Sequence, residues 1–278
     1  MSQFWGISLN DDSRVECALH PYCDSLAFDT GNAGGWGLGY YSRGELLQRV
    51  EPRKYGETLD GCRLASGLRA DLIIMHTRMA TVGPAKRVNI HPFRFQQWLF
   101  AHNGTIEGFE TFRKTLIDSM PPFIQRRLRG DTDSEHLFYL FLSFLYDAGV
   151  VGRSDLGTDP IRAALVRTFA AVDELARMAG FPRSDSSVVV SDGYSFVVGS
   201  RGIPVDYTII DTVADCQVCR RSIQPGQNEP SRVDHPDLKA VLAISKQQEQ
   251  PPPGFKRLDK NSLLLVSKKS SYKITSFG

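Results

Sequence analysis

The first hundred residues alternate short apolar runs with polar or glycine-rich stretches, a pattern typical of buried strands separated by turns. Arg43-Gly44 is a turn signal between two such runs and predicts a hairpin. The runs of strand length are Gln3–Leu9, Trp36–Tyr41, Glu45–Val50, Asp71–His76 and Trp98–Ala101. The N-terminal third is therefore predicted to be mostly sheet.

The middle of the chain changes to helical spacing. A short helix is expected earlier, within Cys17–Phe28, and longer ones at Phe109–Met120 and Leu137–Tyr146, the latter after an acidic start. A further helix is predicted at Pro160–Ala179, with Asp159 as its N-cap. Three longer helices thus follow the first strands.

Strand-like runs return after residue 186. Asp192-Gly193 separates two of them and predicts a second hairpin. These runs are Ser187–Val190, Phe196–Gly199, Asp206–Ile210, Ala240–Ile244, Ser262–Val266 and Tyr272–Thr275. Ile223–Asp234 and Gln247–Gly254 are predicted to be loops. The order of strands, helices and strands, without a repeat or a sharp boundary, predicts a single α+β domain over 1–278 with helices covering packed sheets.

Composition excludes several classes of function. The 278 residues carry a formal net charge of +2, which gives no reason to expect a nucleic-acid or membrane partner. The chain has no apolar run of the ~18 residues that a membrane-spanning helix needs, and its first residues do not resemble a secretory signal. Five cysteines fit a reducing, cytoplasmic setting better than a disulfide framework.

Candidate chemistry lies where predicted strands end and a helix begins. Arg78 could hold a carboxylate through two parallel hydrogen bonds, and Asp133 could hold an ammonium group. The side chain of Asn103 and the backbone N–H of Gly104 could stabilise an oxyanion. The simpler alternatives are an Asn-Gly turn, a surface ion pair for Arg78 and a helix cap for Asp133.

Several motifs together resemble the class II glutamine amidotransferases, and in particular their small stand-alone members. The motifs are His76-Thr77-Arg78-Met79-Ala80-Thr81, Asn89-Ile90-His91-Pro92-Phe93, Phe100-Ala101-His102-Asn103-Gly104 and Asp131-Thr132-Asp133-Ser134-Glu135, with Trp36–Tyr41 as the second strand. The resemblance is specific to about residue 140, looser to Gly199 and weak beyond, so the part from about 200 is divergent. It implies the N-terminal-nucleophile hydrolase fold, a four-layer αββα sandwich.

The resemblance also implies roles for individual residues. Arg78 would bind the α-carboxylate of glutamine and Asp133 its α-ammonium group, while Thr81 would line the same pocket. Asn103 and Gly104 would form the oxyanion hole. No cofactor is implied.

The nucleophile would be the residue that removal of Met1 exposes, which is a cysteine in this family and Ser2 here. A free α-amino group of pKa ~7.7–8.0 readily activates a thiol of pKa ~8.5 but activates a serine hydroxyl less well. Three interpretations remain open: a natural or engineered replacement that silences the enzyme, a working serine hydrolase, and a binding protein.

The sequence therefore predicts an amidohydrolase or amidotransferase that converts glutamine or another γ-glutamyl amide to glutamate and ammonia, with activity weakened or lost through Ser2. The alternative is a non-catalytic glutamine- or γ-glutamyl-binding subunit. Transfer of ammonia would need an accepting partner subunit.

Two further groups of residues could suggest metal binding. His76, His91 and His102 match no known ligand spacing and are expected to hold strand ends by hydrogen bonds. Cys216 and Cys219 form a CxxC with His235 downstream, but a fourth zinc ligand is not evident. No metal is expected, and the CxxC is predicted to be a structural feature remote from the glutamine pocket.

Overall fold

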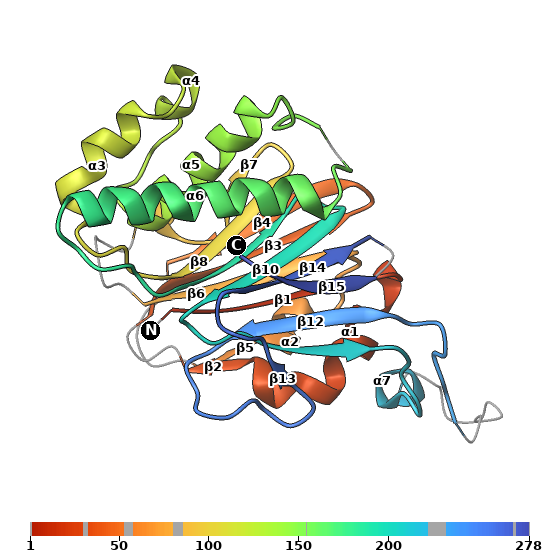
Figure 1. Cartoon of the computed structure of the whole chain (residues 1–278). Helices are drawn as coiled ribbons and strands as arrows, with labels where there is room; N and C mark the ends of the chain where they lie inside the picture. Colours follow the sequence, from red (N-terminus) through yellow and green to blue (C-terminus); the bar gives the residue numbers. More distant parts are fainter. Residues whose placement is uncertain are drawn as a thin grey trace.

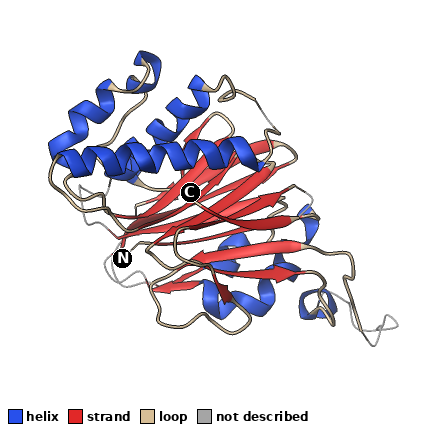
Figure 2. Ribbon diagram, viewed as in Figure 1, coloured by secondary structure: helices blue, strands red, loops and turns tan. Residues whose placement is uncertain are grey.

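The computed structural model describes residues 2–29, 33–52, 58–79, 86–153, 155–221, 232–268 and 271–277. Two antiparallel sheets pack face to face, with helices on both outer sides (Figures 1 and 2). This is the expected four-layer αββα arrangement. Three apolar clusters hold the layers together: one lies between the two sheets, and each of the others lies between one sheet and its helices.

The first sheet has seven strands with β1 near its centre. The order is β13 (Lys256–Arg257), β11 (Asp206–Ile210), β12 (Ala240–Ser245), β1 (Gln3–Leu9), β6 (Leu72–Met79), β3 (Ala33–Ser42) and β4 (Glu45–Glu51). Six of the seven residues of β1 are buried, as expected of a strand covered on both faces.

The second sheet has six strands. The order is β15 (Tyr272–Ser276), β14 (Ser262–Ser267), β10 (Ser195–Arg201), β9 (Ser186–Ser191), β8 (Trp98–Gly104) and β7 (Phe93–Phe95). A separate ribbon pairs β2 (Ala27–Asp29) with β5 (Thr58–Asp60). Strands from beyond residue 200 thus complete both large sheets.

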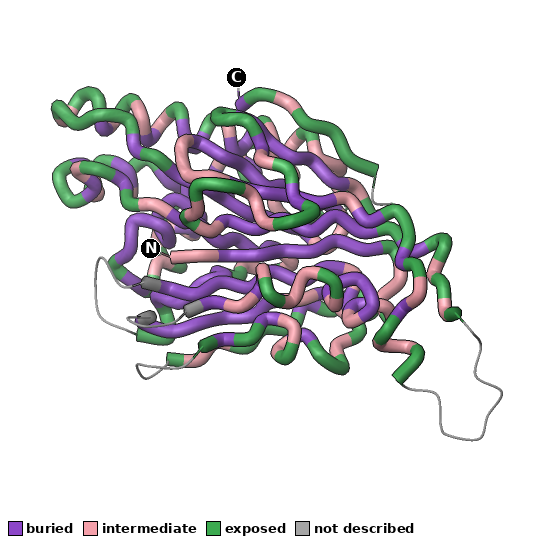
Figure 3. Tube along the Cα trace, turned by 90° about the horizontal axis from the view of Figure 1, so that it is seen from below, coloured by how far each residue is buried: buried purple, intermediate pink, exposed green. Residues whose placement is uncertain are grey.

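Helices cover the two outer faces unequally. The second sheet is covered by α3 (Phe109–Asp118), α4 (Pro122–Gln125), α5 (Asp133–Asp147) and α6 (Thr158–Met178), which share its apolar cluster. The first sheet is covered by α1 (Val15–Leu19), α2 (Gly61–Ala65), α7 (Gln217–Arg221) and the 3-10 turn η2 (His20–Leu26). The 3-10 turns η1 (Asp12–Arg14) and η3 (Arg87–Asn89) lie in connections. Figure 3 shows the buried strands inside and the exposed positions on helices and loops.

The strand and hairpin predictions are confirmed, but two local predictions are wrong. Asn103 and Gly104 are not a turn: they continue β8 and pair with Ser187 and Ser186 of β9. The N-cap of α6 is Gly157, so Asp159 lies inside the first turn. Each difference arises because a distant partner or an earlier backbone turn overrides the local signal.

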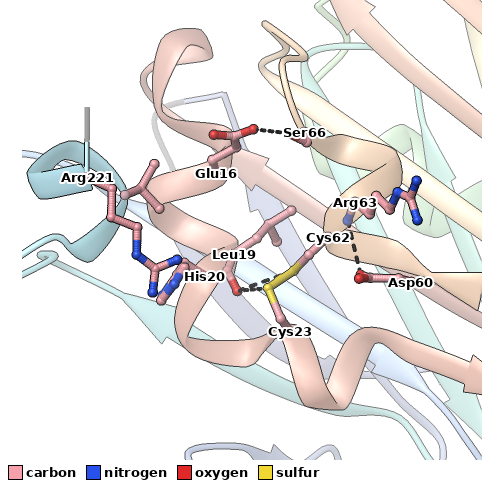
Figure 4. Close-up of a pocket in the computed structure, with 10 residues that line it drawn as sticks. Glu16, Leu19, His20, Cys23, Asp60, Cys62, Arg63, Ser66 and Arg221 are labelled. Atoms are coloured by element: carbon pink, nitrogen blue, oxygen red, sulfur yellow. Dashed lines mark hydrogen bonds between the residues drawn. A yellow bond between two sulfur atoms is a disulfide. The ribbon is translucent and has the colours of Figure 1, made fainter.

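The expectation of unpaired thiols is wrong for two of the five cysteines. A disulfide joins Cys23 of η2 to Cys62 of α2, 39 residues apart (Figure 4). It lines a cavity of about 460 Å³ on the outer face of the first sheet, where Glu16 and Ser66 are hydrogen bonded to each other. The free cysteines are Cys17, Cys216 and Cys219.

No helix in the described ranges has both the length and the apolar character needed to cross a membrane.

Candidate active site

The site lies where the two sheets meet, at the N-terminal end of β1. Gln3 pairs with Thr77 of β6, and Phe4 pairs with His76 of β6 and with Ser245 of β12. Ser2 comes directly before β1. The antiparallel pairing therefore brings Ser2 beside the C-terminal ends of β6 and β12.

Asn103 connects the two sheets at this point. It lies on β8 and is 2 % exposed, yet each end of its side-chain amide has a partner in the other sheet. Nδ2 donates to Oγ of Ser245 at 3.0 Å, and Oδ1 lies 3.1 Å from Nε2 of His76. Ser187 of β9 extends the network, with its Oγ 2.6 Å from that of Ser245. Because a buried polar group is costly unless satisfied, this network fixes the orientation of the amide.

Gly104 has a backbone conformation and a setting that only glycine suits. Its φ is +138°, and a Cβ added there would lie 2.7 Å from the backbone oxygen of Asp185. The sequence Asn103-Gly104 is therefore used for a close approach of backbones rather than for a turn.

Ser2 and Gly104 line the same cavity. Its volume is about 440 Å³, within the range of roughly 300–1,000 Å³ typical of small-molecule sites. The other lining residues are Thr105, Glu107, Asp185, Gly202, Ile203, Pro204 and Gln247. Arg78, Asn103 and Asp133 are not among the residues that line it.

Arg78 and Asp133 form a buried pair of opposite charges. Their exposed fractions are 4 % and 7 %. Burial lowers the pKa of the Arg78 guanidinium, while the negative charge of Asp133 opposes that shift. The two side chains are thus within electrostatic reach of each other, although they come from β6 and from the first residue of α5.

The carboxylate of Asp133 also fixes the segment after Gly104. Its Oδ2 accepts a hydrogen bond from the backbone N–H of Ile106 at 2.7 Å, and its Oδ1 accepts one from that of Ser134 at 2.8 Å. A carboxylate has about four lone-pair sites, so further donors can still bind. Asp133 therefore positions the backbone next to the candidate oxyanion site and keeps capacity for an ammonium group.

Burial lowers the pKa of all three histidines in this region, but their hydrogen bonds differ. His102 lies between two hydroxyls, with Nδ1 2.8 Å from Oγ of Ser134 and Nε2 3.1 Å from Oγ of Ser186. Burial lowers the pKa of His76 to about 3 and that of His102 to about 4. Burial also lowers the pKa of His91 well below its usual value, and neither of its ring nitrogens has a hydrogen-bond partner.

The hydrogen-bonding role predicted for the histidines is thus confirmed for His76 and His102 and wrong for His91. His91 instead packs against the ring of His76, with centroids 4.2 Å apart.

Four of the predicted site residues fall into two pairs, and the sequence did not reveal the residues that position them. Ser2 and Gly104 share a cavity, and Arg78 and Asp133 form a charge pair. Thr81 lies outside the described residues. Ser245 was missed because a lone serine at the end of an apolar run gives no signal until β12 is placed beside β1.

Comparison with known sequences gives a consistent result. Residues 1–198 match the family described as class II glutamine amidotransferases. A probable glutamine amidotransferase of Saccharomyces cerevisiae is 27 % identical over 183 residues, which cover 60 % of this chain and 51 % of the yeast protein. An uncharacterised protein of Methanocaldococcus jannaschii is 31 % identical over 148 residues, 51 % of this chain and 38 % of that protein. The matches therefore span about half or less of these relatives.

Comparison with solved structures shows the same fold. A glutamine aminotransferase class-II domain protein from Silicibacter pomeroyi superposes with a TM-score of 0.58 at 19 % identity, over 99 % of both chains. That agreement extends to the part beyond residue 200, where the sequence motifs are weak.

Proposed function

The chain belongs to the class II glutamine amidotransferases, and on that premise we propose that it hydrolyses glutamine or another γ-glutamyl amide with Ser2 as the nucleophile. The observation that carries the proposal is that Ser2 and Gly104 line one cavity. A nucleophile and an oxyanion donor must lie on either side of the same reacting carbonyl.

Recognition of the substrate is assigned to the buried charge pair. An α-amino acid carries one carboxylate and one ammonium group, which complement Arg78 and Asp133. Because Arg78 comes from β6 and Asp133 from the first turn of α5, the fold fixes the distance between the two charges, and the site would select the spacing of the substrate's groups as well as their charge.

The proposed chemical step uses two groups of Ser2 and one water molecule. The hydroxyl of Ser2 attacks the side-chain carbonyl carbon, and the free α-amino group of Ser2 accepts the hydroxyl proton. The carbon–nitrogen bond then breaks, the proton passes to the leaving ammonia, and a glutamyl ester remains on Ser2. Water hydrolyses the ester and restores the hydroxyl.

The oxyanion of each tetrahedral intermediate would be held by the backbone N–H of Gly104 and by Nδ2 of Asn103. Nδ2 carries two hydrogens; it donates to Oγ of Ser245 at 3.0 Å and lies 3.5 Å from the backbone oxygen of the same residue, at the limit of a hydrogen bond. In this proposal the hydrogen on the side of the long 3.5 Å contact turns to the oxyanion when substrate is bound. Such a donor contributes about 10²–10³ in turnover in other hydrolases.

Ser2 also supports a second candidate, a glutamine- or γ-glutamyl-binding subunit without catalysis. A serine hydroxyl is much less acidic than a thiol, so the α-amino group activates it poorly. If glutamine is hydrolysed, use of the released ammonia in a synthesis would require an ammonia-accepting partner.

The test is ammonia release from glutamine by wild type, Ser2→Cys, and Ser2→Cys carrying a retained N-terminal extension. We expect slow release by wild type, faster release by Ser2→Cys, and none with the extension, because an acylated amine cannot accept the proton. Intact mass verifies a free amine at residue 2 in the first two proteins.

Two outcomes separate the candidates. If Ser2→Cys with a verified free amine releases no ammonia but still binds glutamine, the catalytic proposal fails and the binding subunit is favoured. Rapid turnover by wild type would instead favour a fully competent serine hydrolase.

A further inference from the structure

Three cysteines and one histidine, far apart in sequence, form a compact cluster on the outer side of the first sheet. The ligand atoms of Cys17, Cys216, Cys219 and His235 all lie within 4.8 Å of one another. Cys17 and Cys219 are 202 positions apart along the chain. The cysteines are the three that do not take part in the disulfide.

The fold brings the four ligands together through ordinary backbone structure. Cys216 directly precedes α7 and Cys219 lies one turn later, so both face α1. Val213 and His235 exchange two backbone hydrogen bonds, at 2.8 and 3.2 Å, which align the segment before α7 with the segment that carries His235. Cys17 is contributed by α1.

The distances agree with a tetrahedral site. Sγ of Cys17 and Sγ of Cys219 are 3.6 Å apart, and Sγ of Cys219 is 3.3 Å from Nε2 of His235. Four ligands around zinc, with Zn–S bonds of about 2.3 Å and Zn–N bonds of about 2.0 Å, would be separated by roughly 3.8 Å between two sulfurs and roughly 3.5 Å between sulfur and nitrogen.

The surroundings favour a charged metal–thiolate centre over three neutral thiols. Zinc with three thiolates and one imidazole has a net charge of −1. The guanidinium of Arg14 donates from an Nη nitrogen to Sγ of Cys219 at 3.3 Å, which neutralises that charge and orients the sulfur. Cys17 and Cys216 are buried, so solvent is excluded from two of the four ligands.

We propose that Cys17, Cys216, Cys219 and His235 bind one zinc ion in a closed structural site. Four protein ligands leave no open coordination position, which is the arrangement of structural rather than catalytic zinc. The ion would join α1 to α7 and to the segment that carries His235. The sequence did not reveal this set of ligands because Cys17 and Cys219 are 202 positions apart along the chain.

The zinc site is separate from the glutamine site. Ser2 precedes the first residue of β1, whereas α1 follows its last residue, and Figure 1 shows the N-terminus and α7 toward opposite ends of that strand. Seven residues of strand span roughly 20 Å. The metal therefore stabilises the scaffold without contact to the reacting groups, and the proposal does not rest on glutamine hydrolysis.

The experiment measures metal in the full chain purified without chelator. Elemental analysis should find about one zinc per chain in wild type and at most about a tenth of that in Cys216→Ser/Cys219→Ser. The matched control is Cys23→Ser/Cys62→Ser, which removes two other cysteines on the same face and should retain full zinc.

Cobalt replacement supplies a readout that does not depend on the stability of a variant. Exchange of cobalt into the wild-type protein should give the intense visible bands of tetrahedral Co²⁺ and a thiolate-to-cobalt band in the near ultraviolet. His235→Ala should weaken the bands and alter their positions, since one ligand is lost.

Three results would overturn the proposal. The first is wild-type protein without stoichiometric zinc that takes up neither zinc nor cobalt under reducing conditions. The second is iron in place of zinc in the purified chain. The third is a disulfide between Cys17 and Cys219, found by peptide mapping of the freshly purified, unreduced protein.

Discussion

The N-terminal end of β1 borders buried amides, serines and charged groups, whereas the cluster of three thiols and an imidazole lies beyond its other end. At the first end, Asn103 contacts Ser245 and His76 across the interface of the two sheets. At the other end, Cys17 and Cys219 meet between α1 and α7, in the helical layer that covers the first sheet. One end therefore suits recognition of a polar substrate and the other suits a soft metal ion, and a single strand holds the two apart.

The difference between these ends can be tested by substitutions that should affect only one of them. The largest effect is expected for Arg78→Ala, which leaves Asp133 without its buried counter-charge and the substrate carboxylate without its partner. Glutamine affinity should fall by about 2–5 kcal/mol, as for other buried charge pairs that lose one member. Calorimetry measures the change.

The matched control for Arg78→Ala is Arg167→Ala on α6. The Arg167 guanidinium lies over the ring of Phe144, away from the cavity. Equal affinity in wild type and the Arg78 variant would contradict the assignment of Arg78 to the substrate.

The next effect concerns Ser245, which joins both sheets. Its hydroxyl accepts from Asn103 Nδ2 and donates to the backbone oxygen of Pro204 at 3.1 Å. Ser245→Ala leaves buried polar groups unpaired and should cost about 1–3 kcal/mol of unfolding free energy. Urea unfolding tests this against Ser143→Ala, whose hydroxyl bonds only to a carbonyl within α5. An equal loss in both variants would contradict a special role for Ser245.

A smaller effect is expected from protonation of His91. Burial holds the pKa of His91 well below the usual value. As the pH falls below about 6.5, the unfolded chain therefore binds a proton at this histidine, whereas the folded chain does not. The contribution of neutral His91 to the free energy of unfolding is therefore fully present above about pH 6.5 and is lost as the pH falls below that value. At pH 5.5 this amounts to about 1.4 kcal/mol.

The test compares unfolding free energies at pH 7.5 and 5.5 for wild type, His91→Leu and His20→Asn. His91→Leu should lose less stability on acidification than wild type, while the control at the partly buried His20 should behave like wild type. Parallel losses in all three proteins would refute the role of His91.

The smallest effect on the glutamine site is expected from Cys216→Ser/Cys219→Ser. Because the cysteine cluster lies beyond the other end of β1, glutamine affinity should stay within about twofold of wild type even as stability falls. Calorimetry on the folded variant checks this. A loss of affinity without unfolding would show that the two ends are coupled.

The sequence predicted the glutamine end far better than the cysteine end. Arg78, Asn103 and Asp133 each lie in a short contiguous motif at the end of a strand or the start of a helix, so local patterns point to them. The hydrogen bonds of Ser245 and the pairing of Asn103 with Ser187 depend on strands contributed by the last third of the chain. Local sequence contains no information on such long-range partners.

The cysteines illustrate the same limit. The CxxC was visible, but its partner Cys17 is 202 positions away, and the Cys23–Cys62 disulfide closes a loop of 39 residues. An odd count of cysteines does not distinguish free thiols from a disulfide with three metal ligands. Only the packing of α1, α2 and α7 against one face of the sheet divides the five cysteines between these two roles.

The central claim is that the hydroxyl of Ser2 reacts with a carbonyl held beside Gly104. The most direct measurement is the intact mass of the wild-type protein after incubation with an electrophilic diazoketone analogue of glutamine, followed by peptide mapping. The account predicts one adduct on Ser2, absent in Ser2→Ala and suppressed by excess glutamine. An unmodified Ser2 in protein that binds glutamine and has a free N-terminal amine would contradict it.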